Sequence, residues 1–188
     1  AQELCNKYNQ VDGVVVDKKV KKDTMNPPKL FSLTKLQNLL GKKYKIPMDK
    51  SLEIVQKLYE NGYLTYPRTN SEYLAVNEKS KIKTIIENIS KIGYPVKFKD
   101  KKTIFDDSKI ESHSALTPTY KIPNKNNLTE EEFLIYQTVF KRFVAVFCSE
   151  DCKVEKTEIK ISVGDLEDFT LKGMIITEPG WTKFDQPS

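Results

Sequence analysis

Apolar residues recur at helical spacing through the middle of this sequence and at every second position near its ends. The clearest helix follows the capping box TEEE at 129–132, after which large apolar residues continue at helical spacing to Phe147. From residue 153 the apolar period changes to two, which predicts strands, and the valine-rich run at 11–22 predicts one or two more. Strands at both ends with helices between them predict an α+β fold, in which a helical domain is inserted into a discontinuous β-rich domain.

Three shorter helices are expected before the long one. Apolar residues lie on one helical face within 31–40, 52–59 and 82–89. The candidate N-caps are Ser32 or Thr34, then Asp49, then Asn77 or Ser80. Gly62 is placed to end the second helix in the left-handed conformation, and Gly93 and Pro95 are expected to close the third.

The domain boundaries are expected at a proline break and at the end of the long helix. Pro27 and Pro28 interrupt regular structure, and the apolar period changes after the long helix. The β-rich domain is therefore expected to comprise residues 1–27 and 148–188, and the helical domain residues 28–147. Residues 97–113 are charged and lack a sustained period, which predicts an irregular surface segment.

Composition and charge exclude several classes of protein. The chain has 188 residues, of which 38% are hydrophobic and 30% charged, so it can bury an ordinary core and is not disordered. Its 31 Lys and Arg against 26 Asp and Glu give a net charge of +5, which favours a polyanionic partner without identifying it. No stretch is long enough to span a bilayer, so no membrane partner is expected. The first residues contain neither an initiator methionine nor a signal peptide, and the sequence reads as a piece of a longer protein.

The cysteines and the remaining motifs give little sign of a metal. Cys5, Cys148 and Cys152 are expected to be reduced, structural thiols of a cytoplasmic protein rather than a disulfide or a metal site. No His, Cys, Asp or Glu cluster has metal-ligand spacing, and there is no glycine-rich phosphate loop. Any metal is expected to be held outside this chain.

The stretch LTYPRTNS at 64–71 has the chemistry of a phosphate-handling nucleophile. A phenol is a weak nucleophile at neutral pH unless a neighbour shares its proton, so Tyr66 needs help. Arg68 supplies part of it, because a guanidinium fork matches two phosphate oxygens. In an extended segment the two side chains share one face, with Pro67 restricting the backbone between them. The alternative is an ordinary strand edge with no chemistry.

The single histidine of the chain lies in a stretch of small polar residues at 111–119. Near a phosphate, His113 could donate a hydrogen bond or move a proton. The alternative is a surface histidine with no catalytic role.

Four blocks of sequence resemble, in the correct order, the central part of the type IA DNA topoisomerases, and most of all their topoisomerase III branch. PPKLFSLTKLQ at 27–37 resembles the family's entry into its helical domain, and SLEIVQKLYE at 51–60 the helix before the active site. LTYPRTNS at 64–71 is similar to the catalytic signature, and HSALTPT at 113–119 to the histidine block.

The resemblance implies a role for each matched residue. Tyr66 would attack a phosphodiester of single-stranded DNA to form a 5′-phosphotyrosine, Arg68 would hold the scissile phosphate, and His113 would contact a phosphate or assist proton transfer. The candidate DNA-binding residues are Thr65, Thr69, Ser71, Gln37, Lys97 and Lys99. Two positions depart from the family: Asn70 stands where an aspartate is common, and Ser114 where a second histidine or a glutamate is common.

The resemblance also implies what the whole protein does. The β-rich domain would be a hinge or arch, and the helical domain would lift away with the covalent 5′ end while supercoiled or catenated duplex DNA is relaxed or decatenated without ATP. Mg²⁺ would be bound by a glutamate and aspartates of a Toprim domain that precedes this region. The 188-residue piece, expected to be monomeric, is therefore predicted to be inactive alone, and its parent to act at the cytoplasmic nucleoid.

Two other functions stay open. A non-catalytic module could bind single-stranded nucleic acid by stacking a base on Tyr66 and contacting its backbone through Arg68 and the lysines of 97–102. Lysine runs are also common on plainly solvated surfaces. A tyrosine recombinase fits less well, because its arginine and histidine box is not seen and its tyrosine joins the 3′ phosphate.

Overall fold

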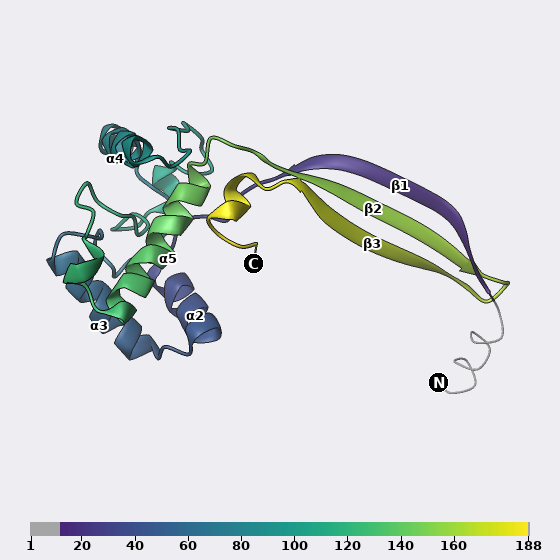
Figure 1. The fold of residues 1–188 in the computed structure, drawn as a ribbon, viewed down its shortest axis with the longest axis horizontal. Coiled ribbons are helices and arrows are strands. Elements are labelled where there is room, and N and C mark those ends of the chain that lie inside the picture. Colours follow the sequence, from purple (N-terminus) through teal and green to yellow (C-terminus); the bar gives the residue numbers. More distant parts are fainter. Residues whose placement is uncertain (1–11, 188) are drawn as a thin grey trace. The chain divides into compact units, whose positions relative to one another are not determined.

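The computed structural model describes residues 12–187, which form two compact units (Figure 1). One unit contains the strands and comprises the described residues up to 26 together with 151–180. The other contains the helices and comprises 27–150 and the residues from 181 onward. The predicted α+β class is confirmed.

The strand unit is a three-stranded antiparallel sheet with strand order β1-β2-β3. Its strands are β1 (Gly13–Met25), β2 (Cys152–Val163) and β3 (Glu167–Glu178). The chain leaves the sheet after Met25 and returns at Cys152 as the direct partner of that residue. The predicted strand character at both ends of the sequence is therefore confirmed, and the two ends form one sheet.

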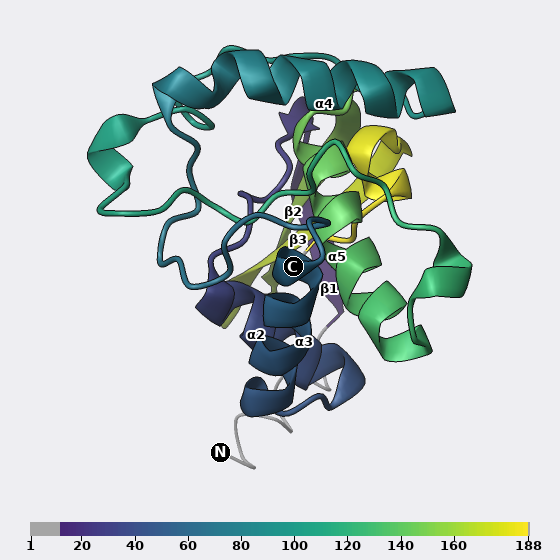
Figure 2. The same cartoon turned by 90° about the vertical axis from the view of Figure 1, so that its left-hand side faces the viewer.

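Four helices fill the other unit, as the apolar spacing predicts (Figure 2). They are α2 (Leu33–Tyr44), α3 (Met48–Glu60), α4 (Lys79–Ile92) and α5 (Glu130–Val146). α3 packs against both α2 and α5, and Lys57 of α3 pairs with Glu132 of α5 at 3.3 Å. Towards its C-terminal end α5 is buried on all sides, which places it at the centre of the core.

The helix caps are partly as predicted. Ser32 caps α2 by accepting a hydrogen bond from the Lys35 amide at 3.3 Å, and Thr129 caps α5 by accepting from the Glu132 amide at 3.1 Å. The prediction that Asp49 caps α3 is wrong, because Pro47 occupies the N-cap position. Asp49 lies in the first turn of α3, where its negative charge interacts favourably with the helix dipole.

The predicted caps of α4 are also wrong. A short 3-10 helix, Val76–Glu78, runs directly into α4, so neither Asn77 nor Ser80 is the first residue outside a helix. The Glu78 carboxylate accepts a hydrogen bond from the Ala75 amide at 2.8 Å, which satisfies a backbone donor at this start. Gly62 has a φ angle of 83°, so its predicted left-handed conformation is confirmed, and Gly93, which ends α4 as predicted, has a φ angle of 114°.

The charged segment 97–113 was predicted to lie at the surface, but part of it is buried. Ile104 and Phe105 are buried, and they flank Leu74 through backbone hydrogen bonds from the Leu74 amide to Ile104 O at 2.8 Å and from the Asp106 amide to Leu74 O at 3.1 Å. Two apolar side chains thus anchor an otherwise charged segment.

The last described residues return to the helical unit, whereas the sequence reading grouped 148–188 with the strands. Asp185 accepts a hydrogen bond from the buried Arg142 of α5, and Lys183 pairs with Glu150 at 2.8 Å. Phe184 packs against the helical core.

Two of the three cysteines lie in the described part of the chain. Cys148 and Cys152 are buried and form no disulfide with each other, and Cys5 lies outside the described residues. Among residues 12–187, no helix has both the length and the apolar character needed to cross a lipid bilayer.

Candidate active site

Two irregular segments that are distant in the sequence lie side by side and bring Tyr66 to His113. The first leaves α3 through Gly62, and the second follows residue 112. They are joined by an antiparallel bridge between Leu64 and Pro118, by the Thr65 amide bonding Thr117 O at 3.1 Å, and by the Thr117 amide bonding Thr65 Oγ1 at 3.0 Å. Thr65, a predicted DNA-binding residue, therefore uses its hydroxyl to hold this pairing.

The Tyr66 ring is half-buried between two other rings. The centroid of the His113 imidazole lies 4.3 Å from that of Tyr66, with 44° between the planes. Tyr59, in the last turn of α3, makes an edge-to-face contact at 5.5 Å and 82°. No hydrogen bond joins the Tyr66 hydroxyl to any of residues 12–187, so the ring is held while its oxygen is left for another partner.

The predicted extended segment around Tyr66 is interrupted by a turn. The chain bends at the buried Pro67, and the Thr69 amide donates to Pro67 O at 2.9 Å, which places Arg68 at the centre of a three-residue turn. Arg68 is exposed and forms no ion pair with the described part of the chain. Its guanidinium is available to an anion beside the tyrosine.

Thr69 and Ser71 lie behind this turn and hold it in place. Thr69 Oγ1 donates to His113 O at 2.8 Å, and Ser71 Oγ donates to Lys109 O at 2.9 Å. Both residues are buried. Their hydroxyls fix the backbone next to Arg68 and His113, and the DNA contact predicted for them has no exposed hydroxyl to support it.

The remaining predicted DNA-binding residues belong to other parts of the helical unit. Gln37 donates to Met48 O at 2.9 Å, across the connection from α2 to α3. Lys97 and Lys99 follow α4, and the Lys97 amide bonds Phe147 O at the end of α5 at 2.8 Å. The backbone of Lys97 is therefore tied to the end of α5.

The sequence reading missed two carboxylates on either side of His113. Asn70 Nδ2 donates to Glu111 at 3.1 Å, and Ser114 Oγ donates to Glu78 at 3.0 Å. The positions that depart from the family pattern, 70 and 114, are thus the two that bond these carboxylates. The sequence reading also missed Tyr59, whose only signal is its place one turn before Gly62.

The described residues do not fit a metal site. Among residues 12–187, no three His, Cys, Asp or Glu side chains gather closely enough to hold a metal ion. The side chains present at this site are a phenol and an imidazole in contact, with a guanidinium two residues further along the chain.

Comparison with known proteins decides the family. The family model for DNA topoisomerase matches residues 1–188. The chain belongs to the DNA topoisomerase family. The resemblance drawn from the four sequence blocks, to type IA topoisomerases and their topoisomerase III branch, is confirmed.

The similar proteins are topoisomerases of several bacteria. DNA topoisomerase 3 of Bacillus cereus is 35% identical over 182 residues, which cover 89% of this chain and 24% of the relative. DNA topoisomerase 1 of Alkalihalophilus pseudofirmus is 29% identical over 197 residues, which cover 100% of this chain and 27% of that protein. The chain thus spans about a quarter of the length of these topoisomerases.

A solved topoisomerase has the same fold. Full-length topoisomerase I from Thermotoga maritima matches with a TM-score of 0.69 and 23% identity, over 100% of this chain and 32% of that one. This similarity establishes the fold of the region around Tyr66.

Proposed function

We propose that this chain is the part of a type IA DNA topoisomerase that carries the DNA-cleaving tyrosine. One observation carries the proposal: in a chain of the topoisomerase family, the Tyr66 ring is held between Tyr59 and His113, next to the exposed Arg68. A side chain that only stacked on a base would not need a guanidinium and an imidazole beside its hydroxyl.

The reaction proposed is a reversible transesterification. The Tyr66 hydroxyl oxygen attacks the phosphorus of a phosphodiester in single-stranded DNA and gives up its proton. The bond from phosphorus to the 3′ oxygen breaks, and that oxygen takes up a proton, which leaves a 5′-phosphotyrosine and a 3′-hydroxyl. Since one phosphate ester replaces another, religation is the reverse step and needs no ATP.

Arg68 and His113 have separate roles in this step. Arg68 binds two oxygens of the scissile phosphate, where a guanidinium stabilises the charge that develops as the phosphorus is attacked. His113 holds the Tyr66 ring by the 4.3 Å contact between their centroids and is placed to donate to a phosphate oxygen or to move a proton.

The rest of the cycle belongs to the whole protein. While the helical unit carries the 5′ end, a second strand or a duplex passes the break, with the strand unit acting as the hinge. In this proposal any Mg²⁺ is held by the glutamate and aspartates of a Toprim domain outside the described residues. No step above uses the ion.

The test is covalent chemistry by the full-length parent protein. With Mg²⁺ and single-stranded DNA labelled at either end, a denaturant-resistant adduct is expected on Tyr66, with the 5′ end blocked and a free 3′-hydroxyl. Tyr66→Phe is expected to abolish it. DNA binding without an adduct would point to the non-catalytic binding module, and a blocked 3′ end to recombinase chemistry.

A further inference from the structure

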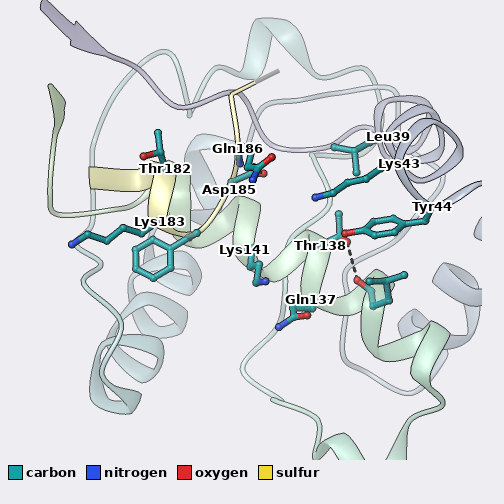
Figure 3. Close-up of a pocket in the computed structure, with 12 residues that line it drawn as sticks. Leu39, Lys43, Tyr44, Gln137, Thr138, Lys141, Thr182, Lys183, Asp185 and Gln186 are labelled. Atoms are coloured by element: carbon teal, nitrogen blue, oxygen red, sulfur yellow. Dashed lines mark hydrogen bonds between the residues drawn. The ribbon is translucent and has the colours of Figure 1, made fainter. Parts of the chain in front are cut away.

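The helical unit contains a cavity of about 210 Å³ that shares no residue with the Tyr66 site (Figure 3). Its walls are the end of α2, one face of α5 and the segment 182–186. In Figure 3, Lys43 and Tyr44 lie on one side and Lys183 on the other, with Lys141 and Gln137 between them.

The wall formed by 182–186 is held in place by buried polar contacts. Arg142 binds Asp185 through Nε, and its Nη1 donates to Lys29 O at 2.9 Å. The same guanidinium lies 4.0 Å from the centroid of the buried Phe31 ring. Because this arginine is buried with three partners, the cavity is preformed and needs no ordering when a ligand enters.

The cavity has a positive charge that the described residues do not neutralise. Asp185 is paired with Arg142, and Lys183 is paired with Glu150 at 2.8 Å. Lys43 and Lys141 form no ion pair with any of residues 12–187, and the Lys43 ammonium lies 5.3 Å from the centroid of the Tyr44 ring. Two ammonium groups at one cavity favour an anionic ligand.

The other lining groups fit a nucleotide. Tyr44 is 36% exposed and offers a ring face on which a base can stack, and the Gln137 and Gln186 amides can bond base or sugar. A volume of about 210 Å³ has room for roughly seven waters, which is enough for a phosphate and part of the attached nucleotide.

We infer that this cavity is a second nucleic-acid site, which holds a phosphodiester of single-stranded DNA between Lys43 and Lys141 with a base on Tyr44. The inference rests on the proposed function for its choice of DNA as the ligand. It adds an anchoring point for the strand that is separate from the cleavage site.

The experiment compares single-stranded DNA binding by matched variants of the 188-residue chain, followed by fluorescence anisotropy at several salt concentrations. Lys43→Gln and Lys141→Gln are each expected to weaken binding several-fold and to lower the salt slope by about one. Lys42→Gln is the control, because it removes the same charge from the residue just before Lys43 in α2, and Lys42 does not line the cavity. Tyr44→Leu is expected to weaken binding and leave the salt slope unchanged.

Three results would overturn the inference. The first is an equal loss in Lys42→Gln and Lys43→Gln, which would indicate diffuse surface charge. The second is that Lys141→Gln weakens the binding of duplex DNA as much as it weakens the binding of single-stranded DNA. The third is that inorganic phosphate or a mononucleotide fills the site without displacing the oligonucleotide.

The same variants in the full-length protein separate this inference from the proposed function. If Lys141→Gln still forms the Tyr66 adduct while its salt slope is unchanged, the inference fails and the proposed function stands. If the lysine variants lose affinity as expected while wild type forms no adduct, the second site stands and the proposed function fails.

Discussion

Asn70 and Ser114, the two positions predicted from the sequence to depart from the type IA pattern, each donate a hydrogen bond to a nearby carboxylate. Asn70 bonds Glu111 at 3.1 Å and Ser114 bonds Glu78 at 3.0 Å. An aspartate at 70 or a glutamate at 114 would place two like charges at hydrogen-bonding distance, which is unfavourable even near the surface. Asparagine at 70 and serine at 114 therefore avoid a repulsion from the carboxylates that they bond.

Asn70→Asp is accordingly expected to lower the free energy of unfolding by about 1 kcal/mol, because it replaces a hydrogen bond with a repulsion. Urea denaturation of the chain at low salt measures this loss. Adding Glu111→Gln is expected to restore most of the stability, since the carboxylate at 70 then faces an amide donor. Equal midpoints for the single and the double variant would contradict the pairing.

Tyr59 is predicted to position the nucleophile. Its ring edge contacts the Tyr66 ring at 5.5 Å, and contacts of this kind contribute about 1 kcal/mol. In the full-length protein, Tyr59→Leu should slow formation of the Tyr66 adduct roughly fivefold, because the Tyr66 ring loses its edge-to-face contact with Tyr59. Tyr59→Phe keeps the ring and serves as the control. A loss in Tyr59→Phe as large as in Tyr59→Leu would assign the effect to the hydroxyl instead.

Residue types could be predicted from the sequence where their chemistry is local. Tyr66, Arg68 and His113 were singled out because a phenol, a guanidinium and an imidazole lay in short polar stretches, and the structure brings Tyr66 and His113 into contact. Glu78 and Glu111 could not be found in this way, because their partners come from other segments.

The apolar spacing predicts the helices and strands correctly, but it predicts the residues at which the helices begin less accurately. The long helix was predicted with its Thr129 cap because both signals lie within four consecutive residues. The start of α3 was misplaced because Pro47 fits the N-cap backbone without a side-chain bond, and the start of α4 because a 3-10 turn precedes it. The burial of Phe105 depends on its pairing with Leu74, which no local pattern reports.

α5 contains an unusual phenol, Tyr136, whose hydroxyl is buried and has no hydrogen-bond partner among the described residues. Burial raises the pKa of Tyr136, with a smaller effect from Tyr94. Its folded pKa lies above the unfolded value, so the folded state keeps a proton that the unfolded state loses as the pH rises past about 10. The ionisation of this group in the unfolded state therefore lowers stability only at alkaline pH.

Tyr136→Phe should consequently flatten the alkaline loss of stability. Relative to wild type, its free energy of unfolding is expected to improve by about 1 kcal/mol more near pH 11 than near pH 8. At neutral pH, removing the unpaired hydroxyl should itself be neutral or stabilising. Chemical denaturation across this range measures both effects, with Tyr120→Phe as an exposed control. Parallel pH curves for wild type and Tyr136→Phe would contradict the assignment.

At the scale of the whole molecule, the change of period predicted the α+β class, and the four blocks predicted the family. The return of residues 181–187 to the helical unit could not be predicted, since it depends on the pairing of Arg142 with Asp185 across a long stretch of sequence. The chain also spans only about a quarter of the length of these relatives, and the proposed function assigns the rest of the reaction to the full-length protein.

This division leads to the last prediction, that the 188-residue chain alone neither nicks nor relaxes supercoiled plasmid. No group among residues 12–187 bonds the Tyr66 hydroxyl to take its proton, and none of their acidic clusters fits a metal ion. The chain should still bind single-stranded DNA weakly and with a steep salt dependence, because the side chains available to contact the DNA backbone are lysines and Arg68. Agarose gels with Mg²⁺ measure both activities, with the full-length protein as the positive control. Nicking by the chain that disappears in Tyr66→Phe would mean that Arg68 and His113 suffice to activate the phenol.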